Sequence, residues 1–315
     1  MDCYWYRPIE EEYHDVFDFI QGVLWAELWR GTIFEYIDEH GREALYRLCK
    51  EYPRFVNRDS VIDIIQHNPF SAIKIGVGTY KWKGDEAPIL KALECGVKFI
   101  DTAPTYGFGK VEKALSTIDL KEVILGSKIP KNYMTRKNIH SSLKRTKDLF
   151  PKKDIHYQLH WPNNKYGLYD SCNTLAFLKR QNSIPSVGLC NCSVQHIKYA
   201  LGFVMIDTLQ IPFNPFRKEF LNYLIPFAKE SNIRVIAHSP FGQDFKKFMA
   251  QDKKKEMFRV AKKLNCTIPQ LILAWIIHHD IIPIPKTNSS KHMEENLDSV
   301  NLKLPNWAVE IMNNL

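Results

Sequence analysis

Four side chains that can hold or move a proton follow short apolar runs in the first half of the chain. They are Asp101 and Tyr106 in KFIDTAPTYGFGKVEK, Lys128 at the end of VILGSK, and His160 at the end of IHYQLH. A phenol with its ordinary pKa of about 10 is a poor acid at neutral pH, and a neighbouring ammonium lowers that pKa by stabilising the phenolate. A carboxylate beside the ammonium keeps it charged and in place. We therefore expect Asp101, Lys128 and Tyr106 to act together as a proton donor.

Short strands separated by helices are expected to position these residues. Before Asp101, Phe99 and Ile100 favour a strand, and Pro104 and Gly107 then break the backbone before a helical pattern begins. Eight runs of strand type occur, at residues 73–78, 97–101, 123–128, 155–160, 186–190, 207–212, 234–238 and 281–285. Helical patterns occupy several of the gaps, at residues 87–95, 136–149, 219–230 and 269–278. The gap before the last run has room for a further helix.

Parallel strands need crossover connections of about this length, and their carboxyl ends meet at one edge of the sheet. The pattern therefore predicts an α/β fold, a (β/α)8 barrel of the TIM type. In such barrels the chemistry is carried by the rim at the carboxyl ends of the strands, where the four side chains converge. A single aspartate after a strand is commonly a turn residue and a single histidine a core residue, but four such residues in successive strand ends indicate a site.

The length of 315 residues allows one barrel of about 250 residues and a small additional part. We assign residues 69–315 to the barrel and residues 1–68 to an all-helical N-terminal extension that is rich in aromatic side chains. Two interpretations of the extension stay open. It is either a clamp packed on the outside or base of the barrel, or a segment that docks a protein partner or covers the active site.

Composition and motifs argue against several classes of protein. The N-terminus lacks the features of a signal peptide, and the longest apolar run, Leu271–Ile277, is far shorter than the roughly 20 residues that span a bilayer, so we expect a cytoplasmic protein without a membrane segment. The seven cysteines are scattered, and Cys190 and Cys192 form a CxC without a second pair, which predicts neither a disulfide framework nor a metal site. The net charge of +8 favours anionic partners, but the basic runs lack the interleaved aromatic residues typical of nucleic-acid binding.

Seven segments, in order along about residues 70–302, resemble the aldo-keto reductase superfamily. They are GVGTYKW, FIDTAPTYG, GSKIP, LHWPN, QIPFNP, AHSPFG and IPIPKTNSSKHMEENL. The resemblance implies a (β/α)8 barrel that binds a nicotinamide cofactor and reduces a carbonyl group of a small molecule. It also implies that Tyr106 protonates the carbonyl oxygen and that His160 orients the carbonyl group.

The same resemblance assigns residues to the cofactor. They are Asn191 and Gln210 at the nicotinamide carboxamide, His238 in place of the aromatic ring that stacks on the nicotinamide, Ser239 and Phe241 at the pyrophosphate, Lys286 and Thr287 at the adenosine 2′-phosphate, His292 in place of an arginine near the adenine, and Glu295 and Asn296 at the adenine. Cys190 replaces the usual serine, and a thiol is a weaker hydrogen-bonding partner than a hydroxyl. Lys286 supplies a charge for a 2′-phosphate, so NADPH is expected rather than NADH.

Trp82 and Trp161 follow the first and fourth strand-like runs, where the family lines its substrate pockets, although ordinary aromatic packing explains them nearly as well. The leading hypothesis is an NADPH-dependent reductase of an aldehyde or ketone. One alternative is a catalytically weak NADPH sensor that docks a partner through its N-terminal helices, similar to potassium-channel β-subunits. Another is a barrel isomerase or lyase that needs no nicotinamide, because a fold does not determine a function.

Overall fold

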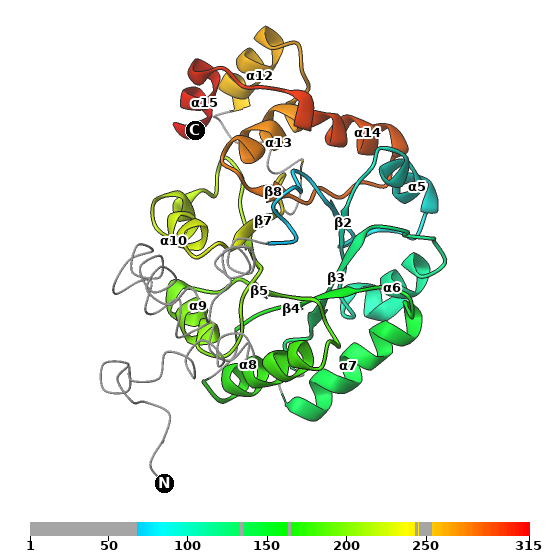
Figure 1. Cartoon of the computed structure of the whole chain (residues 1–315). Coiled ribbons are helices and arrows are strands. Elements are labelled where there is room, and N and C mark those ends of the chain that lie inside the picture. Colours follow the sequence, from blue (N-terminus) through cyan, green and yellow to red (C-terminus); the bar gives the residue numbers. More distant parts are fainter. Residues whose placement is uncertain (1–67, 133–134, 163–164, 243–244, 246–253) are drawn as a thin grey trace, which may run out of the picture.

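A computed structural model describes residues 68–132, 135–162, 165–242, 245 and 254–315 of the chain. Eight parallel strands follow one another in sequence order and form a barrel inside a ring of helices (Figure 1). The strands are β1 (Val77–Gly78), β2 (Phe99–Asp101), β3 (Ile124–Ile129), β4 (Ile155–Leu159), β5 (Ser186–Cys190), β6 (Thr208–Pro212), β7 (Arg234–His238) and β8 (Ile282–Pro283). The (β/α)8 barrel expected from the sequence is confirmed. The expected N-terminal extension, apart from Asn68, lies outside the described residues.

Helices join successive strands and pack on the outside of the barrel. They are α5 (Glu86–Glu94), α6 (Lys110–Leu115), α7 (Arg136–Leu149), α8 (Lys165–Arg180), α9 (Val194–Leu201), α10 (Leu224–Glu230), α12 (Lys254–Lys263), α13 (Ile268–His278), α14 (Ser290–Asp298) and α15 (Asn306–Asn313), with short 3-10 helices η3 (Tyr106–Gly109), η4 (Glu219–Asn222) and η5 (Ser299–Asn301). The side chain of Asp85 accepts a hydrogen bond from Ala87 N at the start of α5, and Thr267 and Gln270 form a capping box at α13. Helix α12 is the additional helix expected before the last strand.

The first and last strands close the barrel with fewer residues than expected. Gly76 N donates to Pro283 O and Gly78 N donates to Pro285 O, each at 3.0 Å, so the backbone of β8 meets that of β1. Proline has no N–H, and Pro283 and Pro285 therefore cannot donate to a neighbouring strand. This explains why the regular part of β8 shrinks to two residues, where the sequence predicted residues 281–285.

The expected helix at residues 219–230 is wrong in one respect, because it is divided. Tyr223 adopts φ −144° and ψ −51°, which ends η4 and precedes α10. Pro226 is the reason, since its ring clashes with a helical carbonyl four residues earlier and is tolerated only in the first turn. A regular helix can therefore begin only just before Pro226.

Residues that precede β1 form the base of the barrel. Asn68 Nδ2 donates to the carbonyl oxygens of Asp207 at 2.8 Å and of Asn232 at 2.9 Å, just before β6 and β7 begin. Phe70 is fully buried and packs edge-on against Phe99, with ring centroids 5.2 Å apart. Asn68 is thus part of the barrel, and a small apolar cluster around Phe70 closes the end opposite the carboxyl ends of the strands.

A polar layer lies inside the barrel between this base and the rim. The ring nitrogens of His156 lie 2.8 Å from Ser186 Oγ and 2.8 Å from Thr208 Oγ1. Burial lowers the pKa of His156 to about 3, so the ring is neutral at neutral pH. Gly188 makes room for this layer, because a Cβ there would lie 2.5 Å from Thr208 Oγ1 and 2.7 Å from His156 Nε2. His156 and Gln158 share one face of β4, so the layer supports the site directly above it.

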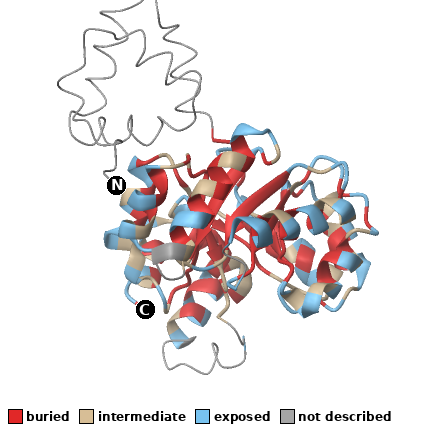
Figure 2. Ribbon diagram, turned by 90° about the horizontal axis from the view of Figure 1, so that it is seen from below, coloured by how far each residue is buried: buried red, intermediate tan, exposed pale blue. Residues whose placement is uncertain are grey.

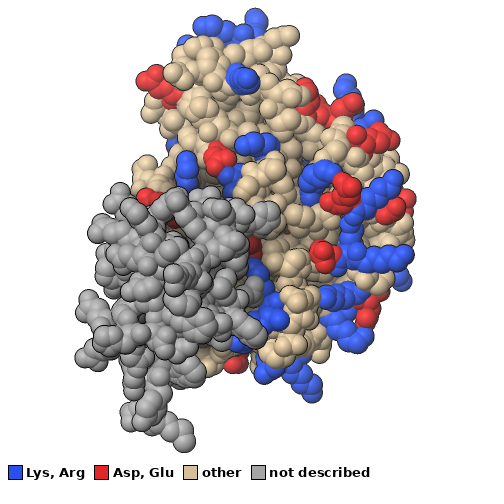
Figure 3. Space-filling model, viewed as in Figure 1, with Lys and Arg blue, Asp and Glu red and all other residues tan. Residues whose placement is uncertain are grey.

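Buried residues concentrate in the strands and on the inner faces of the helices, and exposed residues lie on the outer faces (Figure 2). Lysine and arginine are spread over the visible face with acidic residues among them (Figure 3). Within the described ranges, no single helix is long and apolar enough to cross a bilayer, although Lys255–Lys263 and Ile268–His278 pass that test as a pair bent by 87°. The same ranges contain no group of three or more histidine, cysteine or acidic residues placed to hold a metal ion.

Candidate active site

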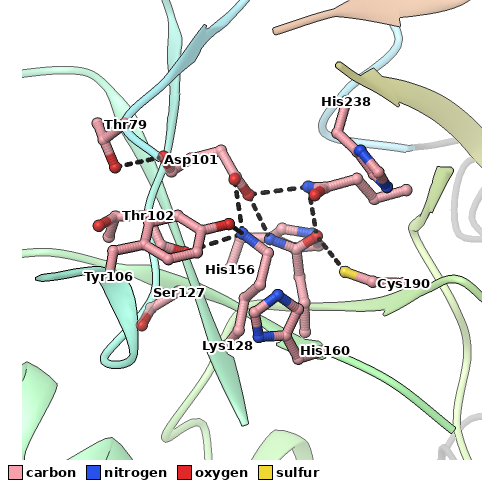
Figure 4. Close-up of polar contacts among 12 residues, drawn as sticks. Thr79, Asp101, Thr102, Tyr106, Ser127, Lys128, His156, His160, Cys190 and His238 are labelled. Carbon is pink, nitrogen blue, oxygen red and sulfur yellow. Dashed lines mark hydrogen bonds and ion pairs between the residues drawn. The ribbon is translucent and has the colours of Figure 1, made fainter. Parts of the chain in front are cut away.

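Strands β2 and β3 and the turn after β2 bring three of the four expected side chains into contact (Figure 4). Lys128 Nζ lies 2.5 Å from Asp101 Oδ2 and 3.2 Å from the Tyr106 hydroxyl oxygen, and it donates to Thr102 O at 2.9 Å. Lys128 is fully buried, and a buried ammonium persists only with such partners. In the register of the two strands Asp101 pairs with Gly126, so Lys128 lies two residues further along and reaches the same rim.

His160 follows β4 and completes the set. Its ring lies edge-on to that of Tyr106, with 6.0 Å between the centroids. The turn that carries Tyr106 is held open by Gly107, Phe108 and Gly109, whose φ angles of 55°, 56° and 84° lie in the left-handed region. Glycine adopts this region readily, and Phe108, which does so at some cost, projects entirely into solvent. The chain then enters α6 at once, which leaves Tyr106 at the rim.

Two glutamines hold the second oxygen of Asp101. Asp101 Oδ1 accepts hydrogen bonds from Gln158 Nε2 at 3.0 Å and Gln210 Nε2 at 2.8 Å. Gln210 Nε2 also donates to Gln158 Oε1 at 3.2 Å, and the Cys190 thiol donates to the same oxygen at 3.4 Å. Both N–H groups of Gln210 are therefore directed into the barrel. Cys190 is buried and contacts Gln158, so its thiol acts inside the network that orients Asp101.

Burial changes the acid strength of the site. Loss of hydration raises the pKa of Tyr106 to about 12, and the charge of Lys128 offsets this only in part. Our expectation that Lys128 brings the phenol pKa below its ordinary value is therefore wrong in the sign of the net shift. Burial alone would lower the pKa of Lys128, but the Asp101 carboxylate, and the Tyr106 phenol once it ionises, outweigh this effect and the net pKa of Lys128 is raised. At neutral pH Tyr106 holds its proton and Lys128 holds its charge.

Two histidines at the rim are neutral. Burial, with the charge of Lys128 acting in the same direction, lowers the pKa of His160 to about 3 and that of His238 to about 4. His238 Nε2 lies 3.1 Å from Asn191 Oδ1, and Asn191 Nδ2 donates to His160 O at 3.2 Å. The backbone of the loop after β4 is thereby tied to Asn191, which follows β5, and to His238, the last residue of β7.

A cavity of about 640 Å³ opens at this rim. The expected site residues that line it are Asp101, Tyr106, His160, Trp161, Asn191, Gln210, His238, Ser239, Phe241 and Lys286. Ligand pockets in proteins commonly have volumes of about 300 to 1,000 Å³. The structure thus brings the residues of six different strand ends around one space large enough for a small-molecule ligand.

Other expected cofactor residues lie beyond the cavity lining. Thr287 follows Lys286 in the loop after β8, and its hydroxyl accepts a hydrogen bond from Ser289 N at 3.1 Å. His292, Glu295 and Asn296 lie on α14. Their roles at the 2′-phosphate and adenine stay predictions.

The two tryptophans differ in position. Trp161 lines the cavity and is 45% exposed. Trp82 is 5% exposed, packs in the main core, and donates through its indole N–H to Asp85 O at 3.0 Å. Trp82 does not line the cavity, which favours the packing interpretation for it. Tyr80 lines the cavity from the same loop, with its ring edge-on to Tyr106 and 5.2 Å between the centroids.

Lysine side chains lie at one part of the cavity. Lys81 and Lys286 both line it, and the backbone N–H of Lys83 donates to Asn288 Oδ1 at 3.3 Å, which joins the loops after β1 and β8. Burial lowers the pKa of Lys286, and the charges of Lys83 and Lys81 lower it further. An anion such as a phosphate would relieve the repulsion among these like charges, so Lys81 and Lys286 could hold one. Together with the amide of Asn191, these groups fit a dinucleotide.

Sequence reasoning missed Gln158, Tyr80 and Lys81. Gln158 lies two residues before His160 in IHYQLH, and the alternation of side chains along a strand places both on one face. Tyr80 and Lys81 directly follow β1 in GVGTYKW, so their place at a strand end was a usable signal.

Several known proteins with similar sequences are named as reductases. An "Aldo-keto reductase" of Gibberella moniliformis is 27% identical over 272 residues, which cover 73% of this chain and 83% of that protein. The "NADH-specific methylglyoxal reductase" of Escherichia coli is 25% identical over 304 residues, which cover 76% of this chain and 93% of that protein. The crystal structure of the thermostable aldo-keto reductase Tm1743, in complex with the inhibitor epalrestat, shares the fold with a TM-score of 0.70 at 24% identity, covering 76% of this chain and 94% of that one.

The match to one family covers most of the chain and the whole rim. Residues 74–315 match the aldo/keto reductase family, and this range contains the four residues expected to carry the chemistry. Members of the family are oxidoreductases that use a nicotinamide cofactor to act on carbonyl compounds. This chain belongs to the aldo/keto reductase family.

Proposed function

We propose that this protein is an NADPH-dependent oxidoreductase that reduces an aldehyde or ketone to an alcohol, with Tyr106 as the general acid. The observation that carries the proposal is the position of Lys128 Nζ, 2.5 Å from Asp101 Oδ2 and 3.2 Å from the Tyr106 hydroxyl. This linked acid lies at a cavity that His160 also lines. An ion pair that is buried only to stabilise the fold does not require a phenol beside it at a cavity, so the contact with Tyr106 favours a chemical role.

Tyr106 enters the reaction with its proton in place, because its pKa is raised to about 12. A reduced nicotinamide held at Asn191 and Gln210 would supply the hydride that the carbonyl carbon accepts. As negative charge develops on the carbonyl oxygen, Tyr106 donates its proton, and the phenolate that remains lies within hydrogen-bonding distance of Lys128 Nζ. Asp101 holds that ammonium in advance, so the charge is stabilised without rearrangement of the site.

His160 is suited to orienting the carbonyl group. Its pKa of about 3 keeps the ring neutral, so one ring nitrogen carries a hydrogen that can be donated to the carbonyl oxygen. A neutral ring does not add a second positive charge beside Lys128. We therefore assign proton transfer to Tyr106 and positioning of the carbonyl oxygen to His160.

The residues for the cofactor divide by chemistry. Lys286, supported by Lys81, suits the phosphates, and the charge of Lys286 is the reason to favour NADPH over NADH. Asn191 suits the nicotinamide carboxamide. Both N–H groups of Gln210 are already used by Asp101 and Gln158, so we assign Gln210 Oε1 the role of accepting a carboxamide N–H. One relative is named for NADH, so this preference needs a direct test.

The experiment follows the loss of NADPH and NADH absorbance with a panel of aldehydes and ketones, for the native chain and for Tyr106→Phe. We expect Tyr106→Phe to lower kcat by about 10²- to 10⁴-fold, as for loss of a general acid, with the dissociation constant of NADPH little changed. Tyr80→Phe is the matched control, because it also removes a phenol hydroxyl from the lining of the same cavity. The phenol expected to donate the proton is that of Tyr106, which is bonded to Lys128. The Tyr80→Phe variant should therefore retain most of the activity.

Each other outcome selects a different function. Equal activity of Tyr106→Phe and the native chain would exclude Tyr106 as the acid. Tight NADPH binding without oxidation by any carbonyl compound would favour the alternative of a sensor that docks a partner. Failure to bind either dinucleotide would favour a barrel enzyme that needs no nicotinamide.

A further inference from the structure

His238 belongs to a chain of three connected polar contacts that runs across the rim from Ser239 to His160. Its Nδ1 lies 3.1 Å from Ser239 Oγ and its Nε2 lies 3.1 Å from Asn191 Oδ1, and Asn191 Nδ2 lies 3.2 Å from His160 O. Asn191 and Ser239 each follow the last residue of a strand and adopt left-handed φ angles of 58° and 54°. Asparagine tolerates such an angle, but it is unfavourable for serine, so the backbone at Ser239 needs support from its surroundings.

The direction of each hydrogen bond follows from the last acceptor. His160 O is a backbone carbonyl oxygen and can only accept, so the amide nitrogen of Asn191 must face it. Asn191 Oδ1 therefore faces His238 and also can only accept, so His238 Nε2 must carry a hydrogen. The ring is neutral, which leaves His238 Nδ1 without a hydrogen and able to accept from the Ser239 hydroxyl. One tautomer of His238 satisfies all three contacts.

We propose that His238 is a positioning residue whose Nε2–H, together with the carbonyl oxygen of His160, holds the Asn191 amide in its orientation toward the cofactor. The inference rests on the proposed function and assigns His238 a task other than stacking its ring on the nicotinamide. Asn191 lines the cavity, and its two contacts leave one amide hydrogen and one oxygen lone pair for a ligand. A carboxamide needs one donor and one acceptor, so a flipped Asn191 would present them in the wrong order. The same chain of contacts joins Asn191 to Ser239 and to the backbone of His160.

Two substitutions separate positioning from stacking. His238→Phe keeps a flat ring and removes both nitrogens, whereas His238→Gln removes the ring and keeps an N–H that can reach Asn191 Oδ1. The dissociation constant of NADPH is measured by fluorescence titration of the full chain. Loss of one hydrogen bond that orients a ligand-binding group should weaken binding by about five- to tenfold in His238→Phe, with His238→Gln closer to the native value. Native-like binding by His238→Phe and weak binding by His238→Gln would overturn the proposal in favour of stacking.

A double-mutant cycle tests whether His238 acts through Asn191. Asn191→Leu alone and the double variant Asn191→Leu with His238→Phe should bind NADPH equally, because the second change has nothing left to orient. Additive losses would contradict the proposal. Thermal unfolding of each variant shows whether it is folded, and the rescue by His238→Gln distinguishes positioning from general loss of structure.

Nitrogen NMR of the full chain without cofactor gives a readout that needs no activity. The two nitrogens of His238, assigned by comparison with His238→Gln, should have the shifts of a neutral imidazole protonated at Nε2. A ring protonated at Nδ1 or at both nitrogens would overturn the proposal. If the native chain binds neither NADPH nor NADH, the proposed function fails, while the NMR result still decides whether His238 holds Asn191 as inferred.

Discussion

Replacing Lys128 with methionine tests the buried ion pair at the centre of the site. Lys128→Met keeps an unbranched side chain of similar length and removes the ammonium that lies 2.5 Å from Asp101 Oδ2. Asp101 is 2% exposed and would remain as a buried charge with two glutamine donors only. Removing one partner of a buried pair costs about 3 to 5 kcal/mol. Because the glutamines still donate to Oδ1, we expect a loss of about 3 kcal/mol in the free energy of unfolding, at the lower end of that range.

Urea unfolding of the full chain, followed by tryptophan fluorescence, measures this loss. Lys144→Met is the matched control, because Lys144 makes an exposed pair with Asp148 at 2.7 Å and should cost less than about 0.5 kcal/mol. Adding Asp101→Asn to Lys128→Met removes the unpaired charge, so the double variant should be more stable than the single one. In Lys128→Met and in the double variant, the rate of carbonyl reduction should fall by about 10²-fold or more. A Lys128→Met protein within about 1 kcal/mol of the native chain, the usual range for exposed pairs, would refute the buried ion pair.

Three further predictions concern pH, the cofactor and the two tryptophans. His156 and His160 have pKa values of about 3 in the folded chain and about 6.5 in the unfolded chain, so the unfolded chain binds more protons between these values. The free energy of unfolding therefore falls as pH drops from about 6.5 toward 3, by about 1.4 kcal/mol per pH unit for each ring. Urea unfolding from pH 4 to 7 should show a slope smaller by one proton for His156→Gln, and an unchanged slope would contradict a neutral buried ring. Lys286→Met should raise KM for NADPH by about 10- to 100-fold and leave KM for NADH nearly unchanged, whereas an equal rise in both would exclude a 2′-phosphate contact. Trp161→Ala should raise KM for the carbonyl substrate, while Trp82→Phe should leave the kinetics intact and cost about 1 kcal/mol of stability through the lost hydrogen bond to Asp85 O.

Apolar runs and turn signals predicted the barrel well, because its strands are buried on both faces and separated by clear breaks. The runs 186–190 and 234–238 agree with β5 and β7 residue for residue. The strand bounds were predicted least well for β1 and β8, because the hydrogen bonds between these strands depend on which backbone N–H groups are present to donate. The prolines at 283 and 285 limit that ladder, and a run of apolar residues does not reveal this limit.

The candidate site was predictable in its residue types and less so in its contacts. Strand ends located Asp101, Lys128 and His160, because a parallel barrel brings every carboxyl end to one rim. Gln158 escaped notice because its value depends on a partner 57 residues away, Asp101 Oδ1, and periodicity gives the face of a strand but no distance. Trp82 was assigned by its place after a strand, but its indole N–H finds an acceptor three residues away and the ring turns into the core.

The raised pKa of Tyr106 is compatible with a role as an acid, because desolvation affects both the neutral phenol before proton transfer and the phenolate beside Lys128 after it. The same low-dielectric surroundings that make the free phenol a weaker acid also strengthen the attraction between Lys128 and a phenolate. That attraction is small while Tyr106 is neutral and grows as the proton leaves. If Lys128 were exposed to water, it would lower the resting pKa of Tyr106 at a smaller cost in folding stability. Its ammonium would, however, stabilise the charge that develops on Tyr106 less strongly. In the proposed reaction, Lys128 held by Asp101 therefore offsets part of the cost of forming a buried phenolate as the proton leaves, which is the point at which it would affect the rate.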